Sequence, residues 1–169
     1  MVVSIKGLDL VALEFNGSCP NIRDKGCPDF ELLSIIKKEL PDLPLIVKIS
    51  VKHGEEYIKE LEQFNCCALD GINTIPYAEL YKETSPLISL GGGGVSGTPI
   101  YERALDYIKN VSLKTRLKLI GGGGITDVVT AAKMAKHADS ISLGTLFLTN
   151  PFAVKPIVSA AENFIYRRV

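Results

Sequence analysis

The chain consists of short apolar runs that end abruptly in polar residues or glycine, with amphipathic segments between them. The runs, each given with the residue that ends it, are 10–15 with Asn16, 45–47 with Lys48, 68–72 with Asn73, 117–120 with Gly121 and 140–143 with Gly144. A β/α barrel builds its active site from the carboxyl ends of its parallel strands, which all lie at one face. The pattern therefore favours an α/β fold in which these end residues lie close together.

The runs are apolar almost throughout, as expected of parallel strands that are covered on both faces. Five of them alternate with helical segments, which predicts α/β architecture. A complete barrel has eight strands and about 250 residues, whereas this chain has 169 residues. We therefore expect one domain, residues 1–169, that forms a partial (β/α) TIM-type barrel of about five strands. A further run at residues 87–90 lies between Pro86 and Gly91 and is interpreted as a loop or minor hairpin.

Helix signals occupy the segments between the runs. Two predicted helices cover residues 28–40 and 54–64, and three more begin at Thr98, at Thr126 as the N-cap, and at Asn150. Proline follows Thr98 and Asn150, and it suits the first helical turn because the N–H groups there are unpaired in any case. The predicted order is a strict alternation of strand and helix.

The charge balance is neutral, with 19 Lys and Arg against 19 Asp and Glu. A nucleic-acid-binding domain would show a basic excess, so no such partner is expected. No apolar run reaches the roughly 20 residues that span a bilayer. Residues 1–5 are too short for the apolar region of a signal peptide. These features predict a cytoplasmic protein without a membrane segment.

The cysteines and histidines give little sign of a metal site or of histidine catalysis. The four cysteines are Cys19, Cys27, Cys66 and Cys67. They lack the paired C-x-x-C spacing of zinc sites, so no metal is expected. The adjacent pair 66–67 precedes an apolar run and is interpreted as small buried hydrophobic residues. His53 in a loop and His137 near a helix end are interpreted as solvated side chains.

Two glycine-rich turns follow the last two runs, one at residues 121–124 and the other at Gly144-Thr145. Glycine allows backbone N–H groups to approach an anion closely, and a following helix adds a favourable dipole. The last two strand-end loops of β/α barrels often form a phosphate site. Tight turns between strand and helix are the alternative, but two such turns on neighbouring strands favour phosphate binding.

Cys19 lies in a polar loop after the first run, in the segment Asn-Gly-Ser-Cys-Pro-Asn of residues 16–21. A nearby cation would make this thiol a usable base or nucleophile. Asn16 and Asn21 offer amide donors and acceptors that suit a flat polar ligand. A structural loop with an incidental cysteine explains the residue types equally well.

Lys48 interrupts an apolar run and needs a partner, because an unpaired buried charge is costly. The partner is either a carboxylate such as Glu14 or an anionic ligand, and the second interpretation is favoured. Asn73-Thr74 fits a turn or a ligand-binding strand end, and the turn is the simpler interpretation of these two residues alone.

Together these segments resemble the dihydroorotate dehydrogenase family. Residues 14–21 are similar to its E-(L/I)-N-x-S-C-P-N segment and residues 44–49 to its P-x-x-V-K strand. Residues 72–74 match its I-N-T strand end, and residues 93–97 are similar to its G-G-x-S-G loop. Residues 120–125 and 143–145 resemble its last two strand ends, so the similarity runs in order along nearly the whole chain.

The resemblance implies an FMN-dependent oxidoreductase of pyrimidine biosynthesis that converts dihydroorotate to orotate. Cys19 would be the base, as in the soluble class, and Lys48 would contact the flavin ring. The substrate-binding residues implied by the resemblance are Asn16, Asn21, Asn73 and Thr74. The flavin-binding residues implied by it are Asn16, Lys48, Ile72, Gly97, Gly123, Gly124, Gly144 and Thr145.

The resemblance covers strands four to eight of the family's barrel, which leaves about half of the expected site. A five-stranded fragment has unpaired strand edges that invite pairing with another chain. We therefore expect a homo-oligomer or a second chain that completes the barrel. The alternatives are a non-catalytic half-barrel that binds FMN or phosphate, and a barrel enzyme that acts on a phosphorylated metabolite.

Overall fold

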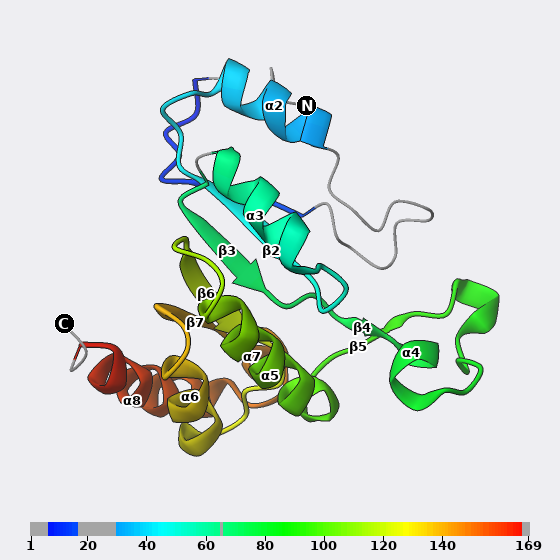
Figure 1. Ribbon diagram of the computed structural model, residues 1–169. Coiled ribbons are helices and arrows are strands. Elements are labelled where there is room, and N and C mark those ends of the chain that lie inside the picture. Colours follow the sequence, from blue (N-terminus) through cyan, green and yellow to red (C-terminus); the bar gives the residue numbers. More distant parts are fainter. Residues whose placement is uncertain (1–6, 17–29, 65, 167–169) are drawn as a thin grey trace.

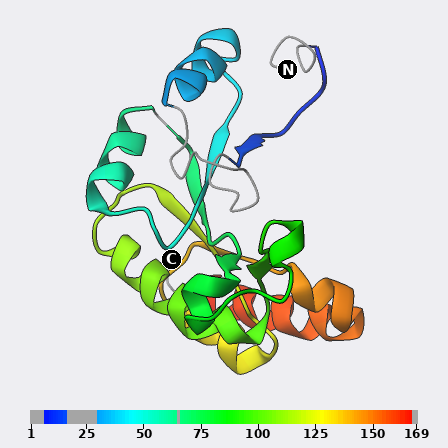
Figure 2. The same cartoon turned by 90° about the vertical axis from the view of Figure 1, so that its right-hand side faces the viewer.

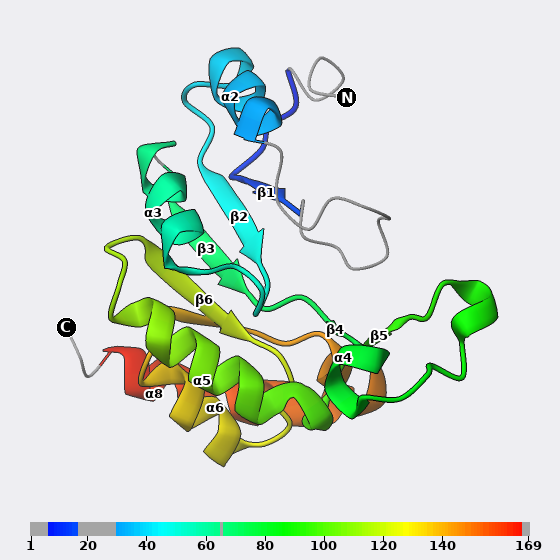
Figure 3. The same ribbon diagram turned by 45° about the vertical axis from the view of Figure 1, so that its right-hand side comes forward.

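The structure is a computed structural model that describes residues 7–16, 30–64 and 66–166. Its central feature is a five-stranded parallel sheet. The strands, in spatial order, are β1 (Leu13–Phe15), β2 (Leu45–Ile49), β3 (Ala68–Gly71), β6 (Lys118–Gly122) and β7 (Ser140–Ser142). Neighbouring strands of this sheet pair in parallel (Figures 1 and 3). The predicted α/β class and the five parallel strands of a partial barrel are confirmed.

Helices separate the parallel strands along the chain. They are α2 (Phe30–Glu39), α3 (Glu55–Gln63), α5 (Tyr101–Ser112), α6 (Val128–Ala135), α7 (Thr145–Thr149) and α8 (Val154–Tyr166). Of these, α7 and α8 follow the last strand. The 3-10 helices η2 (Thr98–Ile100) and η3 (Pro151–Ala153) lead into α5 and α8, which agrees with the predicted starts at Thr98 and Asn150. Helices α2 and α8 lie at opposite ends of the molecule (Figures 1 and 2).

The hydrophobic core lies between one face of the sheet and the helices. In β2, Leu45, Val47 and Ile49 are buried on this face, whereas the residues between them are partly exposed. The same alternation places Gly71 of β3 against α5, where an added Cβ would lie 2.7 Å from Ile108 Cδ1. The core residues contributed by helices include Leu33, Ile36, Ile58, Leu61, Ala104, Met134 and Ile157.

The opposite face of the sheet is the concave face of the partial barrel. Ile46 and Lys48 of β2 point to it, and so do Asp70 of β3 and Ser142 of β7. The prediction of strands covered on both faces is therefore only half correct for this chain. The described sheet is covered by helices on its core face and remains partly accessible on the other, which in a closed barrel would face the remaining strands across the interior.

A small excursion interrupts the alternation between β3 and α5 and projects from the sheet (Figures 1 and 3). It contains the antiparallel pair β4 (Ile75–Pro76) and β5 (Gly94–Val95), together with α4 (Tyr77–Tyr81) and η1 (Ile88–Leu90). The run at residues 87–90 therefore forms part of a loop excursion, in agreement with the loop interpretation, and it adds no strand to the parallel sheet.

Three expectations from the sequence are wrong. The N-cap of α6 is Asp127 rather than Thr126, because the Asp127 carboxylate accepts the Thr130 backbone N–H at 2.8 Å. Cys66 is buried as predicted, but Cys67 is exposed. His53 is buried, with its Nδ1 accepting the Ser50 N–H at 3.3 Å and its ring centroid 4.0 Å from that of Tyr57. His137 is partly exposed in the turn after α6.

Among the helices of the described residues, none is long and apolar enough to cross a membrane.

Candidate active site at the carboxyl ends of the strands

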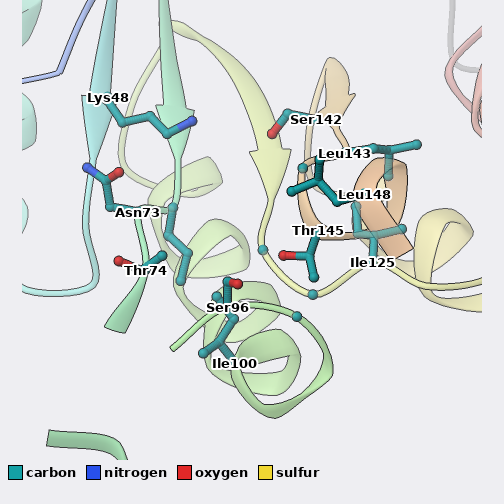
Figure 4. Close-up of a pocket in the computed structure, with 15 residues that line it drawn as sticks. Lys48, Asn73, Thr74, Ser96, Ile100, Ile125, Ser142, Leu143, Thr145 and Leu148 are labelled. Carbon is teal, nitrogen blue, oxygen red and sulfur yellow. The ribbon is translucent and has the colours of Figure 1, made fainter. Parts of the chain in front are cut away.

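A cavity of about 330 Å³ lies where β2, β3, β6 and β7 end (Figure 4). Its lining residues are Lys48, Ile72, Asn73, Thr74, Ser96, Gly97, Ile100, Gly123, Gly124, Ile125, Ser142, Leu143, Gly144, Thr145 and Leu148. This volume is at the lower end of the range of small-molecule pockets, about 300–1,000 Å³. Three of the five residues that end the apolar runs line this cavity, and so do Gly123 and Gly124 of the glycine turn that follows another run.

Lys48 extends from β2 into this cavity (Figure 4). Its ammonium donates a hydrogen bond to Oδ2 of Asp70 and lies 3.8 Å from Oε1 of Glu14. The two sequence interpretations of Lys48 therefore do not exclude each other. Lys48 has carboxylate partners, of which Asp70 is in direct contact, and it also lines the cavity where an anionic ligand would bind.

Asn73 and Thr74 follow β3 and line the same cavity. The Asn73 backbone N–H donates to the Ile49 carbonyl at 3.1 Å, which holds Asn73 beside the end of β2. Its side-chain Nδ2 donates to Oδ1 of Asn16 at 2.8 Å. Asn16 does not line the cavity, but this bond joins the end of β1 to the residues that do.

The glycines at this site differ in the space around them: Gly123 and Gly124 leave no room for a side chain, whereas Gly144 does. Gly123 and Gly124 adopt φ values of +103° and +78°, which disfavour other residues. An added Cβ would lie 2.9 Å from Ala104 Cβ at Gly123, and 2.5 Å from the Gly97 carbonyl oxygen at Gly124. Tight packing on α5 and η2 thus requires both glycines. At Gly144 an added Cβ would meet no atom within 4 Å, so that turn is open.

Besides Ser142, which lines the cavity, Asp70 is a polar residue beside this site that sequence reasoning missed. Its side chain is 4% exposed, and the Ser142 hydroxyl donates to its Oδ1 at 3.3 Å. Asp70 lies within the apolar run at residues 68–72, but only residues 72–74 at the end of that run are predicted to take part in the site. The sequence did contain a signal for Asp70. Like Lys48, it is a charged residue within an apolar run, and a carboxylate there needs a partner as much as an ammonium does.

The carboxyl group of Glu14 is affected by its position beside this ion pair. Partial burial raises the pKa of Glu14 above its ordinary value of 4.5, and the nearby Lys48 ammonium lowers it in part. The nearby Asp70 also raises the pKa of Glu14, because a neighbouring carboxylate disfavours a further negative charge. The arrangement therefore carries one cation and two carboxylates on the concave face, and the cation lines the cavity.

Two of the predicted site residues, Cys19 and Asn21, lie outside the described residues. The other predicted residues converge on the cavity, either as lining residues or, for Asn16, through Asn73. The donor set combines an ammonium, amide and hydroxyl groups and glycine-rich turns with an apolar wall. Such a set suits a ligand that has a flat ring with a polar edge and an anionic group.

Comparisons with known proteins agree with this arrangement. The family model for dihydroorotate dehydrogenase matches residues 5–165. One relative is the catalytic subunit of dihydroorotate dehydrogenase B (NAD(+)) from Desulforamulus reducens, which is 30% identical over 166 residues. The match covers 92% of this chain and 55% of that relative. The protein of the same name from Streptococcus pneumoniae is 31% identical over 166 residues, with 90% and 53% covered.

Solved structures show the same fold. The ligand-free DHODH of Eimeria tenella superimposes with a TM-score of 0.73 at 18% identity, covering 93% of this chain and 52% of that one. The complex of that protein with ferulenol gives a TM-score of 0.72. The chain thus spans about half the length of the relatives that it matches. Since the family model matches nearly all of its residues, the chain belongs to the dihydroorotate dehydrogenase family.

Proposed function

We propose that this chain forms the flavin- and substrate-binding half of an FMN-dependent enzyme that oxidises dihydroorotate to orotate. The observation that carries the proposal is the cavity at the carboxyl ends of the strands, where Lys48, Asn73, Thr74 and the glycine turns converge in a member of this family. The whole activity is a proposal because the chain spans about half of its relatives.

The residues around the cavity fit FMN. The ammonium of Lys48 and the apolar side chain of Ile72 suit the flavin ring, and the turn at Gly144 leaves open space for a phosphate. The other residues that we assign to FMN are Asn16, Gly97, Gly123, Gly124 and Thr145. When bound, FMN would supply the hydride acceptor, while the protein orients it and adjusts its electronic properties.

The substrate would be held beside the flavin by amide and hydroxyl groups. Asn16 and Asn73 form one hydrogen-bonded pair, and Thr74 follows directly, so these groups form a polar rim. We assign Asn21 to the same rim from its sequence motif. Cys19 would take the proton from the substrate ring, because a thiolate at this strand end is the base that the motif implies.

A partner would complete the site. The matched relatives are named catalytic subunits, which places them in assemblies with other subunits. The sheet described for this chain has two end strands, β1 and β7, with free edges on the described residues. We propose that a second copy or a second polypeptide pairs with these edges and closes the barrel.

Flavin binding is the first test of the proposal. The purified 169-residue chain is titrated with FMN, and binding is followed by the change in flavin fluorescence and absorbance. We expect saturable binding, with anaerobic bleaching of the flavin on addition of dihydroorotate. Failure to bind FMN, both alone and in the presence of any copurifying partner, would overturn the proposal.

Substitution of Cys19 by serine tests the base. We expect C19S to retain FMN binding and to reduce bound flavin at least 100-fold more slowly at neutral pH, because general-base catalysis contributes about 10²–10⁴-fold. Cys67→Ser is the matched control, because Cys67 is exposed at the opposite end of β3. Equal reduction rates in C19S and the wild type would exclude Cys19 as the base.

A non-catalytic half-barrel that binds FMN or phosphate is the second candidate. The observation that favours it is the share of the relatives covered, about half, together with the accessible concave face. It predicts FMN binding without bleaching by dihydroorotate. The titration described above therefore distinguishes the two functions.

A further inference from the structure

The concave face carries a chain of polar contacts that crosses the sheet from β2 to β7. Lys48 of β2 contacts Asp70 of β3, and Asp70 accepts a hydrogen bond from Ser142 of β7. In Figure 4 the Lys48 ammonium and the Ser142 hydroxyl point towards each other across the cavity. Asp70 lies between these two lining residues and does not itself line the cavity.

The strand register brings Lys48 and Asp70 together. The two residues are direct partners in the parallel pairing of β2 with β3, so their side chains leave the same face of the sheet. Asp70 is nearly inaccessible, with 4% of its side chain exposed, compared with 18% for Lys48 and 42% for Glu14. Asp70 therefore lies close to the Lys48 ammonium and is held by its strand, whereas Glu14 is farther from the ammonium and more exposed.

The contact from Ser142 depends on a glycine. β6 lies between β3 and β7, so Ser142 reaches Asp70 across β6. Gly122 of β6 is the register partner of Ser142, and an added Cβ there would overlap the Ser142 hydroxyl. Gly122 belongs to the glycine-rich turn for which the sequence pattern predicts phosphate binding. Because Gly122 has no side chain, the Ser142 hydroxyl of β7 can reach across β6 to Asp70.

We propose that Asp70 is a positioning residue that fixes the Lys48 ammonium at the cavity and offsets its charge. This inference rests on the proposed function, because the expected ligand of Lys48 is the flavin. Reduction adds negative charge to a flavin, and nearby charges adjust its electronic properties. An ammonium already paired with a buried carboxylate stabilises that added charge less than an unpaired one does. Asp70 therefore keeps the reduction potential of bound FMN low.

The positioning is tested first without flavin. Proton-detected ¹⁵N spectra of lysine ammonium groups in the full chain report whether the Lys48 protons are held in a hydrogen bond. We expect a slowly exchanging Lys48 signal, assigned by its absence in Lys48→Gln, that disappears in Asp70→Asn and persists in Glu14→Gln. A wild-type chain without this signal, or an Asp70→Asn chain that keeps it, would overturn the proposal.

The charge offset is tested with FMN bound. We expect Asp70→Asn to raise the reduced-to-oxidised ratio of the flavin about tenfold at a fixed potential, which is about 30 mV for a two-electron couple. Glu14→Gln removes the same charge from a more distant and more exposed site and should shift the ratio less than threefold. Equal shifts in the two variants would contradict a specific role of Asp70.

A double variant shows whether Asp70 acts through Lys48. In a Lys48→Gln background we expect Asp70→Asn to change the flavin ratio by a smaller factor than in the wild type, because the direct field of the carboxylate remains while the residue that Asp70 positions is gone. An undiminished tenfold change there would show that Asp70 acts directly and would overturn the positioning role. If the wild-type chain binds no FMN, the proposed function fails, and the ammonium spectra still decide the position of Lys48.

Loss of folding is distinguished by a milder change. Ser142→Ala removes only the hydroxyl that contacts Asp70, so the strand and its charges remain. Should Asp70→Asn lose its circular dichroism signal, Ser142→Ala replaces it in the ammonium spectra. We expect faster proton exchange of the Lys48 ammonium in that variant, and an unchanged exchange rate would overturn the proposed network.

Discussion

At the scale of single residues, two adjacent cysteines show how the start of a strand determines side-chain chemistry. Cys66 is buried and Cys67 is exposed, although the sequence suggested the same environment for both. Burial raises the pKa of the Cys66 thiol to about 11, because the charged thiolate loses its hydration there. Burial and not residue type therefore separates these two thiols.

Alkylation measures this difference directly. When the folded chain is treated with iodoacetamide at pH 8, we expect Cys67 to be modified and Cys66 to remain unmodified, because the thiolate is the reactive form. Peptide mass spectrometry gives the extent at each residue. Treatment in urea is the control and should modify both cysteines, whereas equal modification in the folded chain would contradict the burial of Cys66.

The candidate site was predicted from the sequence only in part. The strand-end pattern and the family motifs indicated Lys48, Asn73 and the glycine turns, and these residues line one cavity. The pattern and the motifs missed Asp70 because a single carboxylate in an apolar run has no periodic signal, and its partner is fixed by the register of β2 with β3. Pairing between strands is a tertiary property, so the direct partner of Lys48 could not be read from its own segment.

At the scale of elements, helix α6 is held at its start by a reciprocal cap. The Asp127 carboxylate accepts the Thr130 backbone N–H at 2.8 Å, and the Thr130 hydroxyl oxygen accepts the Asp127 N–H at 3.1 Å. The hydrogen bond from the Thr130 backbone lowers the pKa of Asp127 below its ordinary value of 3.8. Two N–H groups that begin a helix unpaired are thereby satisfied.

Removing this cap should destabilise the protein. We expect Asp127→Ala to lower the free energy of unfolding by about 0.5–2 kcal/mol near neutral pH, measured by urea denaturation. Because the pKa of Asp127 is lowered by folding, its contribution is present above pH 3.8 and is lost as the pH falls through the lowered pKa. The difference between the two proteins should therefore shrink in acid.

Asp127→Asn is the control for the charge. Asparagine keeps the acceptor of the cap without a titrating group, so we expect most of the stability to remain. The acid-dependent part attributable to residue 127 should vanish in this variant. A difference between the wild type and Asp127→Ala that stays constant down to pH 2 would contradict the charged cap.

The longer elements were predictable and the short ones were not. Helices α3 and α5 show the apolar periodicity of amphipathic helices, and their predicted positions agree with the structure within a few residues. Helix α4 and the pair β4–β5 have only 5 and 2 residues per element. Such elements are too short for a period to appear, so their conformation depends on the surrounding tertiary structure.

At the scale of the whole molecule, the sheet formed by the described residues has open edges, and exposed apolar residues follow its last strand. The open-edge surface, as we term it, consists of Phe147, Leu148 and Phe152, which are 61%, 85% and 92% exposed. These residues lie in α7 and η3, directly after β7 along the chain. Large exposed apolar side chains that lie close together along the chain are candidates for an interaction site. The open-edge surface supports a partner that packs beside β7.

Polar substitution on this surface should weaken association. We expect the Phe147→Ser/Phe152→Ser double variant to have a lower solution mass than the wild type in light scattering after gel filtration. Leu113→Ser is the control, because Leu113 is 78% exposed at the end of α5 and lies outside the open-edge surface. A wild-type chain that is monomeric with every candidate partner would contradict the assembly.

Leu148 belongs both to the cavity and to the open-edge surface. A partner seated on that surface would therefore meet the ligand through one shared side chain. Thermodynamic linkage is reciprocal, so the factor by which the partner tightens ligand binding equals the factor by which the ligand tightens assembly. If contact through Leu148 favours both events, occupancy of the cavity and completion of the barrel would rise and fall together as one cooperative equilibrium.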